Sequence, residues 1–321
     1  MRRRSGETAT EDRVGLVYVM GAGHSGSTIL GITLGNCDGF FCAGELEEWL
    51  MAAARPRWGA ADRQDFWSAV KERIGDVDVL FGGSANRCLE RSSASFRVDL
   101  WPTRRRLRPA YRRLARELIV AVADVSRARY VIDTSHFPLR ARELRDLPGV
   151  DLYLIYLVRD PRAVVASNTR ELSPHELAEL RWRKLTMNAN LWLTQLLAMR
   201  TFVSHPPDRR MFVRHEDFLA DPDGVTRQIL AMVGSDAELP DLDALTVQAP
   251  LQGNELIRAE RVAVRRGGSA PSPRDTFTSL AQAVWRPLLG RMTPAAKPAL
   301  ETAGEGAAGR RRDTPLASTR S

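Results

Sequence analysis

The segment from Val14 to Leu34 constrains the fold most, because a glycine-rich turn joins a buried strand to a helix there. Residues 14–20, VGLVYVM, have the continuous apolar character of a strand buried on both faces of a parallel sheet. The turn GAGHSGST follows, and a helix is predicted from Ser27 to Leu34. A strand, a glycine turn and a helix N-terminus together present unpaired backbone N–H groups that bind phosphate. The segment therefore predicts a phosphate-binding loop at the start of an α/β fold.

This loop lacks the lysine of nucleoside triphosphatases. The pattern G-x-x-x-x-G-K-[ST] places a lysine against the β- and γ-phosphates and a hydroxyl on Mg²⁺, but here Ser27 stands where that lysine would be. The substitution indicates a nucleotide without a β/γ-phosphate pair. A nucleotide with one 5′-phosphate that carries another group for transfer fits, and 3′-phosphoadenosine-5′-phosphosulfate (PAPS) is such a molecule. A P-loop kinase or NTPase is the alternative, with Asp133 as its candidate Walker-B residue.

Strands and helices alternate along the chain. Strands are predicted at 40–42, 130–133, 152–158 and 210–214, and helices at about 46 onward, 109–127, 138–147, 161 onward, 173–202 and 222–233. Residues 55–95 mix helix and loop. This alternation implies a parallel sheet with right-handed crossovers. We expect one three-layer α/β domain of the P-loop type at 14–292, a flexible N-terminus at 1–13 and a disordered tail at 293–321.

The charge of the chain favours anionic partners. Its net charge is +8 and its pI about 10.0, which suits a phosphorylated small molecule, an anionic membrane surface or nucleic acid. Only three of the 47 basic residues are lysine, so arginine or histidine must supply most cations. The arginine-rich stretch 104–116 predicts a solvated surface helix, with apolar positions such as Leu114 and Leu118 on the opposite face. Aromatic residues are not interleaved with its arginines, so no nucleic acid is expected.

Three cysteines fit neither a disulfide framework nor a zinc site, and we expect them to be reduced. No apolar run approaches the roughly 20 residues that cross a bilayer. No apolar segment follows the basic N-terminus either, so a cleaved signal peptide is not expected. These observations predict a cytoplasmic protein.

Six segments occur in a fixed order between residues 14 and 286: GAGHSGST, CAGELEEW, VIDTSHFP, LPGVDLYLIYLVRDPRAVVAS, FVRHEDFLADP and LQGNELIR. In these segments the chain resembles the PAPS-dependent sulfotransferases, especially a bacterial branch of that family. The resemblance implies the P-loop sulfotransferase fold, with PAPS as the sulfuryl donor and PAP as the product.

The resemblance also implies the ligands of the donor. Those around the 5′-phosphosulfate are Gly23, His24, Ser25, Gly26, Ser27 and Thr28. Those at the 3′-phosphate are Arg159 and Ser167, with Gly253, Asn254 and Arg258 closing over that end. Independently of the family, Arg159 follows a central parallel strand, where open α/β sheets bind ligands, and a guanidinium suits a dianionic phosphate. Asp160 is predicted to cap the next helix, with Pro161 at its first position.

Sulfuryl transfer needs an in-line acceptor, a base for its proton and donors for the charge on the leaving oxygen. Glu45 follows the second predicted strand at the ligand edge, and the resemblance implies a glutamate base at this position. A helix from about Leu46 would turn Glu47 and Glu48 to other faces. Relatives usually carry Lys or Arg at the position of His24, and lysine near that of His136. This chain has histidine at both, so an imidazolium, a neutral imidazole, or His136 acting as the base are all open.

The sequence thus predicts an enzyme that moves the sulfuryl group from PAPS to a hydroxyl, or less readily an amine, of a small-molecule, glycolipid or secondary-metabolite acceptor. No metal is expected, since a monoanionic sulfuryl group needs little charge neutralisation. The alternatives are a kinase or NTPase, and a non-catalytic protein that binds PAP or polyanions. The acceptor and the oligomeric state stay open, because acceptor pockets are built from the variable segments 50–110 and 170–205.

Overall fold

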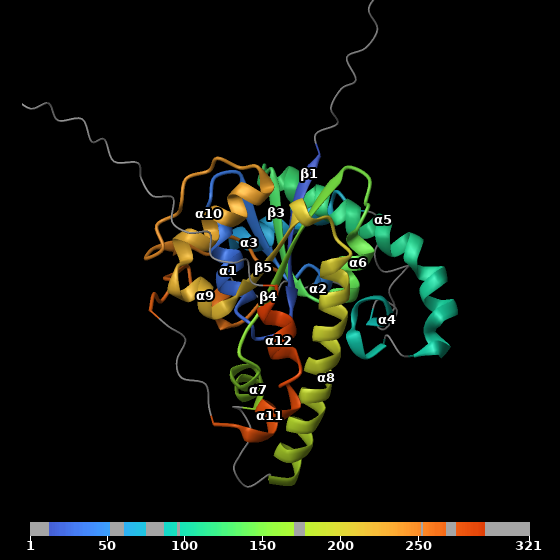
Figure 1. The fold of residues 1–321 in the computed structure, drawn as a ribbon. Coiled ribbons are helices and arrows are strands. Elements are labelled where there is room, and N and C mark those ends of the chain that lie inside the picture. Colours follow the sequence, from blue (N-terminus) through green and yellow to red (C-terminus); the bar gives the residue numbers. More distant parts are fainter. Residues whose placement is uncertain are drawn as a thin grey trace, which may run out of the picture.

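The computed structural model describes residues 13–51, 61–74, 87–94, 97–169, 177–251, 253–267 and 274–292 (Figure 1). A parallel sheet with the strand order β2-β3-β1-β4-β5 forms its centre. The strands are β1 (Val14–Gly21), β2 (Phe40–Gly44), β3 (Tyr130–His136), β4 (Val150–Val158) and β5 (Arg210–Arg214). Since all five run in one direction, their carboxyl ends lie along one edge of the sheet.

Alternate residues of β1 enter two separate hydrophobic cores. Leu16, Tyr18 and Met20 face one core, whereas Val17 and Val19 face the other, and all five are fully buried. This arrangement explains why the segment is apolar without interruption, because both faces of the strand are covered by helices.

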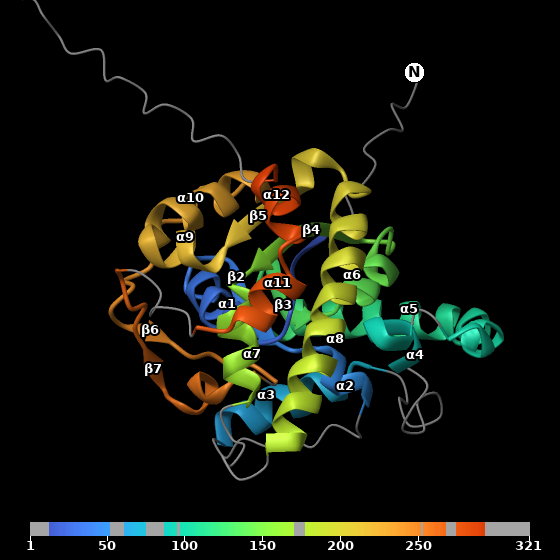
Figure 2. The same cartoon turned by 60° about the horizontal axis from the view of Figure 1, so that its bottom comes forward.

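Helices cover both faces of the sheet (Figures 1 and 2). On one face lie α1 (Ser27–Gly35), α9 (His215–Ala220) and α10 (Pro222–Val233); on the other lie α5 (Trp101–Ser126), α6 (Pro138–Leu144) and α8 (Leu177–Val203). The shorter helices are α2 (Glu47–Met51), α3 (Ala61–Lys71), α4 (Arg87–Glu90), α7 (Pro161–Thr169), α11 (Thr276–Ala281) and α12 (Trp285–Gly290). The fold is therefore the expected three-layer α/β arrangement.

The arginine-rich helix α5 differs from its prediction in two respects. It begins at Trp101 rather than Pro109, because Pro102 occupies its first turn and Pro109 interrupts the hydrogen bonding without ending the helix. Its predicted apolar face is buried, including Leu114 and Leu118. Its arginines are not simply solvated, however: Arg104 is buried, and its Nε lies 2.5 Å from the carbonyl oxygen of Cys88.

The other predicted elements match to within a few residues, and Asp221 caps α10 by accepting from the N–H of Gly224 at 2.8 Å. The start of the helix predicted at 173–202, up to residue 176, the tail at 293–321 and the N-terminal segment apart from Arg13 lie outside the described residues.

The chain after β5 folds back over the sheet. A small antiparallel pair, β6 (Leu245–Thr246) and β7 (Arg261–Val262), flanks the 3-10 helix η4 (Glu255–Arg258). Beyond it, α11 packs beside α8, where Asn188 donates to the hydroxyl of Thr278 at 3.1 Å. In the part of the chain that the structure describes, no helix is both long and apolar enough to span a bilayer.

Candidate active site

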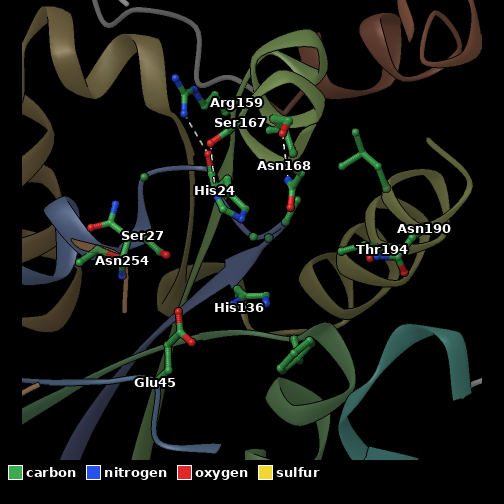
Figure 3. A pocket seen from close by; sticks show the side chains of 18 of the residues that line it. His24, Ser27, Glu45, His136, Arg159, Ser167, Asn168, Asn190, Thr194 and Asn254 are labelled. Carbon is green, nitrogen blue, oxygen red and sulfur yellow. Dashed lines mark hydrogen bonds between the residues drawn. The ribbon is translucent and has the colours of Figure 1, made fainter. Parts of the chain in front are cut away.

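A cavity of about 840 Å³ opens at the carboxyl edge of the sheet (Figure 3). Every strand of the sheet delivers a side chain or loop to it: the glycine-rich loop after β1, Glu45 after β2, His136 at the end of β3, Arg159 after β4 and His215 after β5. The remaining walls come from α7, α8 and the segments around Ser92 and Asn254. Residues far apart in sequence meet here because parallel strands end at the same edge.

The glycine-rich loop turns sharply at Gly26, whose φ of 93° lies in the left-handed region. A Cβ at this position would overlap the imidazole ring of His215, so the loop needs glycine both for its backbone conformation and for this close approach. No side chain caps the first turn of α1. The first amides of that helix and its positive dipole end therefore face the cavity, as the sequence predicted for a phosphate-binding loop.

His24 links this loop to the opposite wall. Its carbonyl oxygen accepts from Nη1 of Arg159 at 3.0 Å, and its Nδ1 lies 3.2 Å from Oγ of Ser167. The backbone of His24 has a φ of 61°, which residues other than glycine adopt only when the surrounding structure imposes it. Figure 3 shows the three side chains together on one side of the cavity. Arg159 and Ser167, which are predicted to bind the 3′-phosphate, therefore both contact His24, which is predicted to lie at the 5′-phosphosulfate.

Two buried nitrogen atoms in this region have no hydrogen-bond partner among the described residues: Nε of Arg159 and Nδ1 of His215. Burial, and then the charge of Arg159, lower the pKa of His215 to about 4, so its ring is neutral at pH 7. A buried guanidinium nitrogen beside a helix N-terminus is suited to an anion, because burial without a partner is costly. These groups fit the phosphates of a nucleotide.

Three carboxylates line the opposite side of the cavity. Burial, followed by the charges of Glu48 and Asp133, raises the pKa of Glu45 to about 7. The expectation that Glu47 and Glu48 point elsewhere is wrong, since both line the same cavity. Glu45 precedes α2, and Glu47 and Glu48 are its first two residues; the turn in which the N–H of Glu48 donates to the carbonyl oxygen of Glu45 at 3.2 Å brings all three to the cavity. Burial raises the pKa of Glu47 as well.

His136 lies between Glu45 and the glycine-rich loop. Its φ is 56°, and a Cβ at Gly23 would lie 3.8 Å from its Nε2. Burial first, and then the positive charge of Arg91, lowers its pKa to about 4. His136 is therefore a neutral imidazole at pH 7 in the free protein, able to accept or donate one proton but not to supply a positive charge.

A buried ionic cluster lies behind the side of the cavity that carries Glu45 and His136. Oδ2 of Asp133 accepts from Nε and Nη2 of Arg140 at 3.1 and 2.9 Å, and Nη1 of Arg140 reaches Oε1 of Glu90 at 3.0 Å. Tyr111 donates to the same Glu90 oxygen at 2.5 Å. Oδ1 of Asp133 accepts from the N–H of Ser135 at 2.9 Å and from its hydroxyl. Asp133 is thereby engaged by Arg140 and Ser135, which argues against a Walker-B role in binding Mg²⁺.

Most of the predicted site residues line the cavity. Gly23, His24, Gly26, Ser27, Thr28, Glu45, His136, Arg159, Ser167, Gly253 and Asn254 all do so. Ser25 is buried behind the loop, and Arg258 is exposed on η4; neither side chain lines the cavity. Asp160 caps α7 as predicted, accepting from the N–H of Arg162 at 2.8 Å.

Sequence reasoning missed several lining residues. The sequence analysis gives His215 no role, although its position directly after a parallel strand is a signal that could identify it. Arg91, Asn168, Asn190 and Thr194 also line the cavity. They come from helices and connections that carry no motif, so their contribution depends on packing alone. Among the described residues, no group of three or more His, Cys, Asp or Glu could hold a metal ion.

The fold and the cavity define a class: a three-layer α/β protein with a glycine-rich loop after its first strand and a cavity beside it that is lined on one side by carboxylates. The family follows from sequence. The model of the Sulfotransferase family matches residues 17–239, more than two thirds of the chain, and the protein belongs to that family. A comparison with curated proteins gives no match.

Among solved structures, the chain is similar to the sulfotransferase domain from the curacin biosynthetic pathway, with 14% identity, 84% of this chain and 97% of that chain covered, and a TM-score of 0.49. It is also similar to the sulfotransferase domain of the Synechococcus PCC 7002 olefin synthase, with 17% identity, coverage of 88% and 98%, and a TM-score of 0.48. A sulfotransferase from Alicyclobacillus acidocaldarius matches with 16% identity, coverage of 70% and 83%, and a TM-score of 0.38. The family assignment rests on the sequence match and not on these likenesses.

Proposed function

We propose that this sulfotransferase uses PAPS as its donor and transfers the sulfuryl group to an acceptor hydroxyl. The observation that carries the proposal is the meeting of Arg159 and Ser167 with His24 on a glycine-rich loop that has no lysine. The loop amides suit a 5′-phosphosulfate, and the buried, unpartnered Nε of Arg159 suits a second phosphate on the same nucleotide. PAPS has both groups, whereas ATP carries its charge in a continuous triphosphate.

In this proposal Glu45 is the general base. Because its pKa is about 7, a large fraction of the Glu45 carboxylate is ionised at neutral pH, and a general base is most effective when its pKa lies near the working pH. The acceptor oxygen loses its proton to Glu45 and forms the new O–S bond as the bond from sulfur to the bridging oxygen breaks. The electron pair of the broken bond goes to the 5′-phosphate of PAP, and the loop amides stabilise the charge that develops there.

The cationic side chains of the described residues that line the cavity are Arg91 and Arg159, and none of the lining residues is lysine. Since His136 is neutral in the free protein, we propose that it orients the acceptor hydroxyl by a hydrogen bond. His24, held by Ser167, would donate to the departing group. The chemistry of the acceptor beyond a hydroxyl, and a cytoplasmic site of action, stay predictions from the sequence.

The test is a thermal-shift comparison of the purified protein with PAP, ATP plus Mg²⁺, ADP and AMP at equal concentrations. A ligand at about 100 times its Kd should stabilise the fold by roughly 2.7 kcal/mol. A shift with PAP that exceeds the shift with ATP plus Mg²⁺ supports the donor site and justifies an acceptor screen with PAPS. Stabilisation by ATP plus Mg²⁺ alone would instead indicate a phosphoryl-transfer enzyme, and no shift with any nucleotide would sink the proposal.

A further inference from the structure

One surface of the protein concentrates exposed apolar side chains. It is formed by Trp182, Leu185 and Trp192 on α8, Phe277 and Leu280 on α11, and Val284 just beyond, and we call it the α8–α11 face. Of the ten large hydrophobic side chains that are exposed in the described structure, six belong to it, with Leu280 73% and Trp182 65% exposed. Exposed apolar residues scattered singly are ordinary in soluble proteins, whereas a concentration of them marks an interaction surface.

The two parts of this face lie side by side. Along α8, Lys184 is 3.2 Å from Asp275, Asn188 bonds to Thr278 and Gln282, and the ring of Trp192 lies 5.1 Å from that of Trp285. These contacts run in the same order along both segments, so α11 and the start of α12 follow α8 in parallel. Figures 1 and 2 both show α11 next to the first half of α8.

The described charged side chains close to this face are mostly basic. On the first half of α8 they are Arg181, Arg183 and Lys184, and on residues 274–291 they are Arg274, Arg286 and Arg291, whereas Arg200 lies at the other end of α8, near Arg142 of α6. The described acidic side chain among these segments is Asp275, which is paired with Lys184.

We infer that the α8–α11 face docks on an anionic lipid bilayer. Protruding tryptophan and leucine side chains insert between headgroups, while arginines around them are attracted by anionic lipids. A protein partner would need a complementary acidic surface with apolar pockets, and a second copy docking through the same face would not offer one, because its described residues there are basic. The opposite surface of α8, with Asn190, Leu191 and Thr194, lines the active-site cavity. Docking through one side of α8 therefore brings the cavity close to the headgroup layer.

The position of α8 gives the inference a consequence for the acceptor. Since α8 is one helix diameter, ~10 Å, across, docking leaves the cavity about that far from the headgroups, within reach of an acceptor hydroxyl carried on an extended lipid headgroup. This consequence depends on the proposed sulfotransferase activity, whereas the docking itself does not.

The test is co-sedimentation of the full chain with vesicles of phosphatidylcholine alone and of phosphatidylcholine with phosphatidylglycerol. We expect binding to the anionic vesicles, weakening as salt is raised, and little binding to the neutral ones. Trp182→Ser and Leu280→Ser should each lower the partition coefficient roughly tenfold, because each removes an inserted apolar side chain. The matched control is Trp101→Ser on α5, where the tryptophan is 59% exposed but lies outside the face; its binding should equal that of the wild type.

Equal loss in Trp101→Ser, equal binding to neutral vesicles, or no binding to either kind would overturn the inference. So would a dimer in light scattering that Trp182→Ser converts to a monomer, since the face would then be a contact between copies. Each variant is also tested for thermal stabilisation by PAP. If a variant loses vesicle binding but PAP still raises its melting temperature, the substitution has affected only the docking face. If PAP does not stabilise the wild type, the proposed function is contradicted and the docking face is not.

Discussion

Arg140 and Asp133 form a fully buried ion pair in which two guanidinium nitrogens lie 3.1 and 2.9 Å from one carboxylate oxygen. The other oxygen of Asp133 lies 3.4 Å from the N–H of Leu46, and the hydroxyl of Ser135 accepts from the N–H of Glu47 at 3.2 Å. The pair therefore fixes the turn that carries Glu45 and the strand end that carries His136. Both candidate bases depend on a cluster that does not itself face the acceptor.

Replacing Arg140 by methionine should destabilise the fold strongly. Asp133 and Glu90 would keep their burial and lose the guanidinium group that pairs with both of them in the described structure, which costs about 3–5 kcal/mol in the free energy of unfolding. Urea denaturation measures the change. The control is Arg113→Met: Arg113 lies 3.8 Å from Glu117 on the surface of α5, and its loss should cost less than about 1 kcal/mol. Equal effects in the two variants would show that the buried pair contributes no more than a surface pair.

Replacing Glu45 by glutamine should change how stability depends on pH. Because the folded state raises the pKa of Glu45 from 4.5 to about 7, it binds this proton more tightly than the unfolded chain does. The contribution of Glu45 is therefore fully present below about pH 4.5 and is lost as the pH rises through 7. The wild type should lose up to about 1.4 kcal/mol per pH unit relative to Glu45→Gln in this window. Parallel stability curves for the two proteins would contradict the raised pKa.

Glu45 and His136 can be separated as candidate bases once an acceptor is found. If Glu45 takes the proton, Glu45→Gln should lower kcat by roughly 10²- to 10⁴-fold and leave the Kd for PAP unchanged. His136→Asn keeps a hydrogen-bonding group and should lower kcat less. In the wild type, kcat/KM should rise with pH and level off above about 7, since the ionised carboxylate is the active form. A larger loss of kcat in His136→Asn would transfer the role of base to the histidine.

Replacing Arg159 by glutamine should remove the preference for a 3′-phosphate. Hydrogen bonds to charged groups contribute about 1.5–3 kcal/mol, so the affinity for PAP should fall about tenfold to a hundredfold. Adenosine 5′-phosphosulfate has no 3′-phosphate, and its affinity should change much less. Calorimetric titration of both ligands measures the difference. Arg162→Gln is the control, since Arg162 pairs with Asp160 at 2.6 Å and does not line the cavity. An equal loss for both ligands in Arg159→Gln would remove the 3′-phosphate assignment.

Replacing Gly26 by alanine should be more harmful than the same change at Gly234. Both glycines have a positive φ, 93° and 71°, so each substitution incurs about 1–2 kcal/mol of backbone strain. A Cβ at Gly26 also meets the ring of His215, whereas nothing lies within 4 Å of one at Gly234. Denaturation and PAP affinity should both be worse in Gly26→Ala. His215→Ala in that background should restore part of the stability, and failure to do so would mean that the ring does not restrict the loop.

The sequence by itself determined the elements whose signals are local. The apolar run of β1, the glycine turn at Gly26 and the Asp221 cap each depend on neighbours in the chain, so strand, loop and helix could be predicted from residue order. The alternation of strands and helices then fixed a parallel sheet, and with it the edge at which Glu45, His136 and Arg159 would meet. The start predicted for α5 at residue 109 is wrong, because the helix begins at Trp101 with Pro102 in its first turn and continues through Pro109, which removes a backbone donor without ending the helix.

Only the tertiary structure decided which side chains surround the acceptor and what their proton affinities are. Arg140 meets Glu90 across 50 positions of the chain and Tyr111 across 29, and no local pattern connects these residues. The raised pKa of Glu45 and the neutral state of His136 arise from burial, which depends on how α2, α4 and α6 pack against the sheet. Sequence order specifies local backbone conformation, but burial and charge pairing exist only when distant segments have come together.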